Sequence, residues 1–293
     1  MKTAMTGGEI RRGEKWRVLT LKILRNAVCI FLCALSILPF LIMIVNATRT
    51  SAQIQQGLSL IPSGNLMNNL ATLFARTDSN ITPWVYLKNS AVISFSTILV
   101  SVYFSSLTAY GLTAYRFRGR KALWTVIMIV LLIPAQVSSI GFYKQMYQWG
   151  FVNNYLALIL PAIASPGTVF FMRQYMKASL QLEIVDAARI DGCGEWRTFN
   201  RIILPILKPA IATQMIFCFI GSWNAYYMPT MLLSRQSMYT LPMFIEILKG
   251  NNYKTDYGVV YTGLTFTILP MLAVYVVLSK NIVAGIALGG LKE

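Results

Sequence analysis

Long apolar runs, separated by shorter polar and basic stretches, set the pattern of this chain. About 20 apolar residues are enough to cross the hydrocarbon core of a bilayer as a helix. Six runs come close to that length, and none of them contains Asp, Glu, Lys or Arg; they cover residues 26–45, 90–115, 123–143, 155–171, 210–233 and 257–279. Because a membrane-spanning backbone must satisfy its own hydrogen bonds, the predicted fold class is all-α, a polytopic membrane protein with six transmembrane helices.

The composition supports this interpretation. With 56% hydrophobic residues, 12% charged residues and a net charge of +16, the chain is too apolar for an ordinary soluble domain. We expect a basic N-terminal segment, 1–25, followed by a six-helix transmembrane domain, 26–293. The first apolar run is longer than that of a typical cleaved signal and is followed by no clear small-x-small site, so we interpret it as a retained span.

The distribution of basic residues predicts the orientation of the chain. Lys and Arg are retained on the cytoplasmic side of short loops. If the N-terminus is inside, 19 of the 26 basic residues fall on the cytoplasmic side. Both termini and the 173–208 segment are therefore predicted to be cytoplasmic. The basic residues flank spans, which is typical of topology signals and lipid-headgroup contacts, and no nucleic acid is expected as a partner.

Several kinds of chemistry are excluded by residues that the sequence lacks. The chain has no His, and its four cysteines show no zinc-binding spacing, so neither a Ser-His-Asp triad nor a His-ligated metal site is possible. A G-K-[ST] phosphate loop is also missing. We therefore predict no catalytic residue, no metal and no cofactor on this chain. Spans without charge favour energy supplied by a partner, with a Na⁺ site built from carbonyls and hydroxyls as the alternative.

A polar loop at about 177–208 separates the fourth and fifth apolar runs. Its residues 183–190 are good helix formers, among which Ala187 and Ala188 leave a low surface that another protein can approach. Gly192 supplies a turn that a side chain would obstruct.

A second short helix follows this turn. It places Trp196 and Phe199 on one face and runs until Pro205 redirects the chain. Two short helices joined at a glycine predict a rigid L-shaped projection that can transmit movement from a partner. The alternative is an amphipathic element that rests on lipid headgroups.

The loop resembles the cytoplasmic coupling loop of binding-protein-dependent ABC importers. That loop has the pattern E-A-A, two residues, D-G-A, five residues, F, two residues, I-x-L-P and a further Pro. The matching positions here are Asp186, Ala187, Ala188, Asp191, Gly192, Cys193, Phe199, Ile202, Leu204, Pro205 and Pro209. Asp186 replaces the usual Glu and Cys193 replaces Ala, and both changes are expected to alter contact strength without removing the role.

The resemblance implies a permease subunit of an ATP-driven importer in the bacterial cytoplasmic membrane. Its implied partners are a second permease subunit that forms a heterodimer with this chain, two ATP-binding subunits that carry ATP and Mg, and an extracytoplasmic solute-binding protein. The matching loop residues are implied to contact the ATPase, and this chain itself is implied not to be an enzyme.

Other segments resemble the carbohydrate class of these permeases. They are 88–121, 221–234, 239–243 and the C-terminal GGLKE, and they imply a sugar substrate, in particular an oligosaccharide. A sugar path needs hydrogen-bonding side chains and aromatic faces in place of charge. The candidates for such contacts are Trp223, Asn224, Tyr226, Tyr227, Gln136 and Gln214. The same residue types also serve as membrane-interface residues or as hydrogen-bonding groups between helices.

Other functions remain open at the level of the sequence. The same loop occurs in permeases for polyamines, phosphate or amino acids. A secondary carrier or channel would need no ATPase, and a membrane-embedded assembly or signalling protein would move no solute. The segment 49–88 is too long for a simple turn, and it either contacts the solute-binding protein or caps the bundle.

Overall fold

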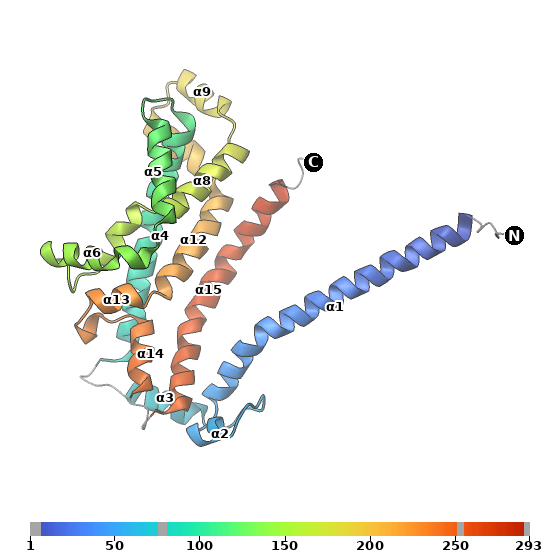
Figure 1. Ribbon diagram of the computed structural model, residues 1–293, viewed down its shortest axis with the longest axis vertical. Helices are drawn as coiled ribbons and strands as arrows, with labels where there is room; N and C mark the ends of the chain where they lie inside the picture. The colour runs from blue at the N-terminus through green and yellow to red at the C-terminus, as the bar shows by residue number, and fades with distance from the viewer. Residues whose placement is uncertain (1–6, 76–80, 251–254, 290–293) are drawn as a thin grey trace. The chain divides into compact units, whose positions relative to one another are not determined.

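The computed structural model describes residues 7–75, 81–250 and 255–289, which fold into helices and connecting turns without a β-strand (Figure 1). This confirms the all-α prediction. The α-helices are α1 (Gly7–Ala47), α2 (Ser51–Gln55), α3 (Leu66–Ala75), α4 (Pro83–Ala114), α5 (Arg120–Leu132), α6 (Ala135–Gln148), α7 (Leu156–Ile159), α8 (Pro166–Ser179), α9 (Glu183–Ile190), α10 (Glu195–Thr198), α11 (Leu204–Ile206), α12 (Lys208–Trp223), α13 (Tyr227–Leu232), α14 (Leu241–Lys249) and α15 (Tyr257–Gly289). Shorter 3₁₀ or π segments are η2 (Leu160–Ile163), η3 (Phe199–Ile203) and η4 (Gln236–Met238).

The described residues contain four continuous segments that are long and apolar enough to cross a membrane. They are Val18–Ala47, Pro83–Ala114, Leu156–Ser179 and Tyr257–Ser279. Two bent pairs, Arg120–Leu132 with Gln136–Gln148 and Glu195–Ile206 with Lys208–Trp223, raise the number to six if each pair is one span. The predicted six spans are reached only in this way.

Two of the six predicted spans are interrupted. The third, 123–143, breaks between α5 and α6 because Pro134 donates no backbone hydrogen bond and its predecessor Ile133 is extended, with φ −79° and ψ 119°. The fifth, 210–233, is also not continuous: α12 ends at Trp223, and the short helix α13 begins only after a turn.

The fourth predicted span is longer than expected and contains charge. We expected it to end at residue 171, whereas α8 continues to Ser179 and so includes Arg173 and Lys177. The expectation that the spans hold no charged residue is therefore wrong for this helix. Arg173 is buried, with 7% of its surface exposed.

The described part of Met1–Ala71, together with Asp256–Thr265, forms one compact unit. It ties the end of α1 to the segment that follows. Asn69 Nδ2 donates to the carbonyls of Ala47, at 2.8 Å, and Arg49, at 3.0 Å. Gly258 lies so close to them that a Cβ there would be 2.6 Å from the Arg49 carbonyl oxygen. Residues 49–71 of the predicted outer segment are thus held by specific hydrogen bonds in this unit.

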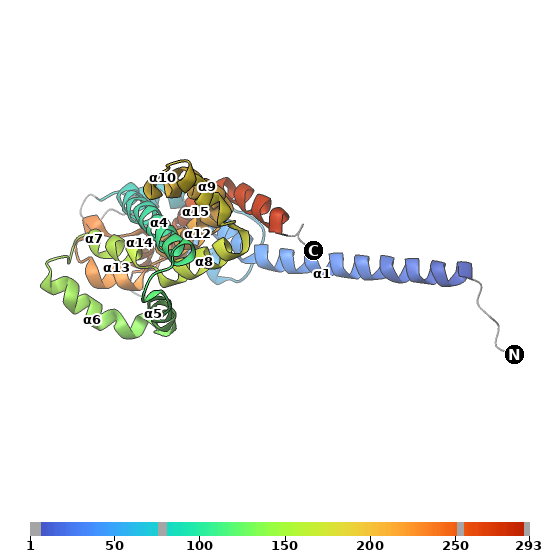
Figure 2. The same ribbon diagram turned by 90° about the horizontal axis from the view of Figure 1, so that it is seen from above.

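The rest of the described chain forms a second unit around α4. Helices α8 and α12 lie alongside α4, and α5 packs on α8 (Figures 1 and 2). Helix α4 buries a series of serines on its packed faces: Ser90, Ser94, Ser101, Ser105 and Ser106. Small hydroxyl residues let helices approach closely in a membrane, where helix association depends on close packing.

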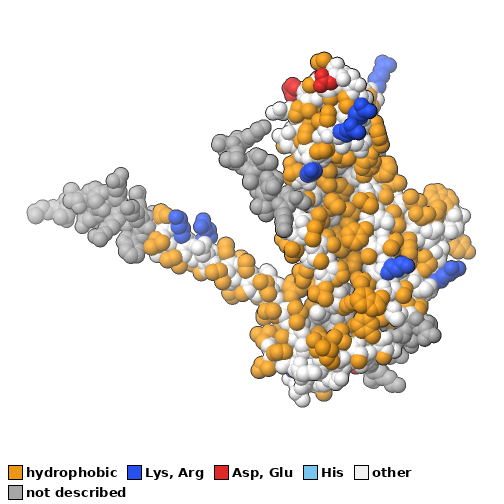
Figure 3. All heavy atoms as spheres, turned by 180° about the vertical axis from the view of Figure 1, so that it is seen from behind, with side chains coloured by type: hydrophobic (Ala, Val, Ile, Leu, Met, Phe, Trp, Pro, Cys, Tyr) orange, Lys and Arg blue, Asp and Glu red, His pale blue; other side chains and the backbone are white. Residues whose placement is uncertain are grey.

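The surface of this unit is largely apolar along the helices (Figure 3). In Figure 3, hydrophobic side chains cover most of the visible face of the helical bundle, and carboxylates appear at the end that carries α9. Exposed apolar side chains on α5 include Val126 and Ile129, each 55% exposed. Such a surface is stable against lipid, whereas the loop that includes α9 carries exposed charged side chains.

Candidate functional site

The 177–208 loop begins with a helix and a left-handed glycine joint. Helix α9 covers Glu183–Ile190, as predicted. It closes with two hydrogen bonds, from Gly192 N to the Arg189 carbonyl at 3.0 Å and from Cys193 N to the Ala188 carbonyl at 2.9 Å. This is a Schellman motif, which requires a left-handed residue directly after the C-cap.

Gly192 supplies that conformation with φ +72°. The reason differs from the predicted one: an added Cβ would meet nothing within 4 Å, so the constraint is the backbone angle and not the available space. Residues with a side chain reach this region only at a cost of about 1–2 kcal/mol. The glycine therefore fixes the direction in which the chain leaves α9.

The second arm of the loop runs as one bent rod into α12. Helix α10 continues through the π-helical η3 and through α11, without interruption at Pro205. The chain turns by 80° only between Ile206 and Lys208. The predicted redirection is thus real but lies at Leu207, two residues beyond Pro205.

A buried apolar cluster packs this second arm of the loop against the helical bundle. Phe199, Ile203 and Leu207 are each no more than 1% exposed and pack with Met172 and Met176 of α8. The cluster fixes the loop against the long helices, so a force on the loop reaches α8 and α12 through packed side chains.

Tyr103 of α4 extends this apolar cluster towards the surface. Its ring lies 5.8 Å from that of Phe199 and 6.3 Å from that of Trp196. Trp196 and Phe199 therefore face the same helix, as predicted, although Phe199 is buried and Trp196 is 63% exposed.

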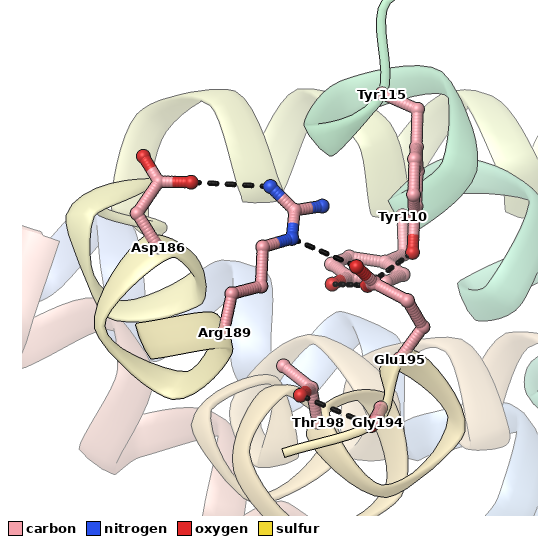
Figure 4. Close-up of polar contacts among 7 residues, drawn as sticks. All are labelled: Tyr110, Tyr115, Asp186, Arg189, Gly194, Glu195 and Thr198. Atoms are coloured by element: carbon pink, nitrogen blue, oxygen red, sulfur yellow. Dashed lines mark hydrogen bonds and ion pairs between the residues drawn. The ribbon is translucent and has the colours of Figure 1, made fainter. Parts of the chain in front are cut away.

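An ionic cluster holds the two arms of the L together (Figure 4). Arg189 donates to Asp186 at 3.1 Å and to Glu195 at 2.7 Å. Glu195 also accepts hydrogen bonds from the hydroxyls of Tyr115 and, at 3.5 Å, Tyr110. The cluster joins α9 and α10, which are consecutive, to the end of α4, which is about 80 residues away in sequence.

The ionisation of this cluster follows from its contacts. The hydrogen bond to Glu195 raises the pKa of the Arg189 guanidinium above its ordinary value, so Arg189 stays charged. Burial raises the pKa of the Tyr115 hydroxyl, and its bond to Glu195 raises it further, so Tyr115 remains a donor at neutral pH. Sequence reasoning missed Glu195, Tyr115 and Tyr110, for which the only local signal was the Asp186 to Arg189 spacing of three.

The predicted coupling residues separate into an exposed set and a buried set. Asp186, Ala187, Asp191, Gly192 and Pro205 are exposed, and Cys193 and Leu204 are half-buried. Ala188 and Phe199 are only 4% and 1% exposed. The expectation that both alanines present a surface to a partner is therefore wrong for Ala188, which faces the interior of this chain. Ile190, at 87% exposed, forms the most prominent apolar position of the loop.

The predicted sugar-contacting residues differ in how far they are buried. Trp223 is 3% exposed and donates to the Thr267 carbonyl at 3.0 Å, which indicates a packing role. Gln214 is buried within α12, whereas Gln136, Asn224 and Tyr226 are exposed.

Tyr227 also is exposed, and its hydroxyl lies 3.1 Å from Ser139 Oγ. The predicted set thus contains both buried and surface positions.

A cavity of about 270 Å³ lies instead among α4, α7, η2, α12 and α13. Its polar lining consists of small side chains: Ser90, Thr97, Ser101, Ser165, Cys218, Ser222 and Thr240. The hydroxyls of Thr97 and Thr240 are buried and have no hydrogen-bond partner among the residues that the structure describes. Buried hydroxyls without partners are uncommon, and they leave donors and acceptors free for a solute or for water.

A polytopic helical bundle with a rigid L-shaped loop between two of its spans defines an importer permease subunit. The chain belongs to the family of that class described as "Binding-protein-dependent transport system inner membrane component", whose model matches residues 101–287. It is accordingly an inner membrane component of a transport system.

The chain is similar to several curated sugar permeases. It is 34% identical to the arabinooligosaccharides transport system permease protein AraQ of Halalkalibacterium halodurans, over 89% of this chain and 93% of the relative. It is 33% identical to the lactose transport system permease protein LacG of Rhizobium radiobacter, over 88% and 92% of the two chains.

A solved structure shares the fold. It belongs to a bacterial ABC transporter involved in the import of the acidic polysaccharide alginate, with a TM-score of 0.74 and 20% sequence identity. The match covers 95% of this chain and 99% of that one. The fold is therefore that of an ABC importer permease.

Proposed function

We propose that this permease subunit passes a sugar, in particular an oligosaccharide, into the cytoplasm, and that separate ATP-binding subunits drive it through the 177–208 loop. The observation that carries the proposal is the loop itself. Its tip is exposed at Ile190 and Trp196, whereas its base is immobilised by Phe199, Ile203 and Leu207. A rigid projection of this kind transmits a push as a rigid-body movement.

The proposed orientation places the loop and both termini in the cytoplasm. The basic residues around the loop and in the turn between α4 and α5 support it, because cytoplasmic segments carry an excess of Lys and Arg. ATP and Mg would then be bound by the partner subunits below the loop, and a second permease subunit would complete the path.

The proposed substrate class rests on the relatives. Those already described carry names of arabino-oligosaccharide and lactose systems, and a further one, 28% identical, is named for diacetylchitobiose uptake. Two related solved structures are of bacterial alginate transporters, one of them in complex with an alginate pentasaccharide-bound periplasmic protein. A solute-binding protein outside the membrane is therefore proposed as a partner. A relative named for sn-glycerol-3-phosphate transport, 29% identical, keeps a non-sugar solute as the second candidate.

The hydroxyl-lined cavity is proposed to form part of the solute path. Its polar side chains are small and uncharged, which suits a neutral polyhydroxyl solute better than a charged one.

The experiment that tests this function is reconstitution in proteoliposomes. The chain is co-purified with its candidate ATPase and permease partners, and ATP-dependent uptake of arabino-oligosaccharides, lactose, chitobiose and glycerol 3-phosphate is measured with the binding proteins added. We expect uptake of one of the sugars only when all components and ATP are present. Uptake by this chain alone would contradict the proposal.

The glycine joint offers a variant with a matched control. Gly192→Val places a β-branched residue at φ +72°, so the joint is strained, by about 1–2 kcal/mol or more. Gly194→Val changes a nearby glycine that has φ −65° and open space around its Cβ position. We expect Gly192→Val to insert normally but to lose ATPase binding or to hydrolyse ATP without uptake, and Gly194→Val to retain coupled uptake. Equal uptake in both variants would contradict the proposal that the left-handed conformation of Gly192 is needed for coupling.

A further inference from the structure

A basic cavity lies on another side of the α4 end, between the turn that connects α4 with α5 and helix α8. It measures about 1140 Å³, and its lining includes the cations Arg116, Arg118, Arg120, Lys121 and Arg173. No carboxylate belongs to the residues that line it. The 177–208 loop contributes no residue to this lining, although Arg116 also lines a second cavity together with Asp186 and Arg189 of the loop.

The deepest cation of this cavity is Arg173, which is 93% buried. Its guanidinium carbon lies 3.9 Å from the centre of the Trp124 ring, and that ring stacks on Phe170 at 6.0 Å. Its Nε atom has no hydrogen-bond partner, and no ion pair with Arg173 is found in the described ranges. A cation–π contact offsets only part of the desolvation of a buried guanidinium. The side chain therefore lacks a counter-ion among the residues that the structure describes.

The start of α5 shows the same deficit of negative charge. Its N-cap is Gly119, which offers no side-chain cap, and its first turn contains no acidic residue but begins with Arg120 and Lys121. Cations at the positive end of a 13-residue helix are unfavourable, whereas an anion there is stabilised by the dipole and by the free amides. The unpaired Arg173 guanidinium and the uncapped start of α5 are thus two independent features that favour an anion in this cavity.

The surroundings indicate where such an anion comes from. Beyond Trp124, α5 continues directly into the exposed apolar surface of Val126 and Ile129. A tryptophan at such a boundary is typical of the level of the lipid headgroups, and basic pockets between spans are typical binding sites for anionic headgroups.

We propose that this basic cavity binds the phosphate group of an anionic phospholipid headgroup. The phosphate neutralises Arg173, caps the amides at the start of α5 and is held by the exposed cations Arg118 and Lys121. The acyl chains lie along the apolar face of α5.

Native mass spectrometry of the assembled transporter, released from nanodiscs, tests the proposal. The nanodiscs contain phosphatidylglycerol and phosphatidylcholine in equal amounts. We expect retained phosphatidylglycerol on the wild-type protein. Its affinity should fall about 25-fold when Arg118→Gln and Lys121→Gln are combined, at about fivefold for each cation removed. Lys144→Gln, which removes an exposed cation on α6, is the matched control and should change nothing. Arg173→Gln should abolish selective retention. If the Arg173→Gln protein does not fold, the combined Arg118→Gln and Lys121→Gln variant still tests the proposal.

Three outcomes would overturn the proposal. Equal retention of the two lipids would show that no anion-selective site exists. Displacement of phosphatidylglycerol by inorganic phosphate at constant ionic strength would assign the cavity to a soluble anion. Retention that disappears whenever the ATP-binding subunits are present would make the cavity a protein-docking surface.

Discussion

At the scale of single residues, the 177–208 loop contains both exposed positions and buried packing positions, and residue type alone does not distinguish them. Ala187 and Ala188 are adjacent and identical in type, yet Ala187 is exposed and Ala188 is 4% exposed. Helix periodicity predicts that neighbours differ in burial, but which one faces inwards depends on where α9 packs. The sequence therefore predicted the helix to the residue and could not assign its buried face.

This difference gives a matched pair of variants. Ala188→Leu overfills a packed position and should destabilise the protein by about 1–3 kcal/mol, seen as a lower unfolding temperature in detergent. Ala187→Leu should leave that temperature unchanged and should weaken binding of the ATPase subunits, because the added side chain lies on the proposed contact surface. The assignment fails if Ala187→Leu is the destabilised variant or if neither change affects ATPase binding.

Gly258 shows a second residue-scale constraint that sequence could not reveal. A glycine in the first turns of an apolar helix is ordinarily replaceable by Ala with a gain in helix propensity. Here the new methyl would lie 2.6 Å from the Arg49 carbonyl oxygen and 2.8 Å from Asn69 Nδ2.

We expect Gly258→Ala to destabilise the protein by about 1–3 kcal/mol in thermal unfolding, because the close backbone contact must open. The control is Gly141→Ala in α6, whose new methyl meets nothing within 4 Å and which should be neutral or stabilising. An unchanged unfolding temperature for Gly258→Ala would show that the contact is not close in the folded protein.

At the scale of helices, sequence periodicity identified the spans but not their interruptions. Pro134 ends a helix locally, which a pattern of apolar residues does not register. The extension of α8 to Ser179 was missed because Arg173 appeared to close the apolar run, whereas Trp124 covers its guanidinium in the folded protein. The bond between Glu195 and Tyr115 joins residues 80 positions apart, so no local pattern predicts it.

The hydroxyl-lined cavity is likewise a product of helix packing. Thr97 lies on α4 and faces residues of α12 and α13, and its hydroxyl has no partner within the described chain. Sequence reasoning favoured larger aromatic and amide side chains for a sugar and passed over small hydroxyls, which occur throughout these spans.

Thr97→Val keeps the shape of the side chain and removes the hydroxyl. If that hydroxyl contacts the solute, the KM for uptake should rise about threefold to tenfold, the value of one neutral hydrogen bond, with the unfolding temperature unchanged or raised. Thr108→Val, which removes a hydroxyl of α4 bonded to the Phe104 carbonyl, should leave KM unchanged. A KM for Thr97→Val equal to that of the wild type would remove Thr97 from the proposed path.

At the scale of the whole molecule, the helices present an apolar surface that suits lipid. The polar 177–208 loop is the part proposed to contact a partner protein. The fold class and the family could be predicted because both rest on patterns that are local in sequence: apolar runs and an 11-position loop pattern. The side of the membrane on which the loop lies and the protein that covers it are the claims on which the proposed mechanism depends.

Labelling of a single cysteine at the tip of the loop measures both claims at once. Ile190→Cys, with the four natural cysteines replaced, places a thiol at a position that is 87% exposed, and Leu58→Cys, at 83%, provides a control in the predicted outer segment. With a membrane-impermeant maleimide, we predict that Cys at position 190 reacts only when the cytoplasmic face is accessible and is protected when the ATPase subunits bind, whereas Cys at position 58 reacts only from outside. Reaction at position 190 from the outer face, or reaction unaffected by the ATPase subunits, would contradict the account.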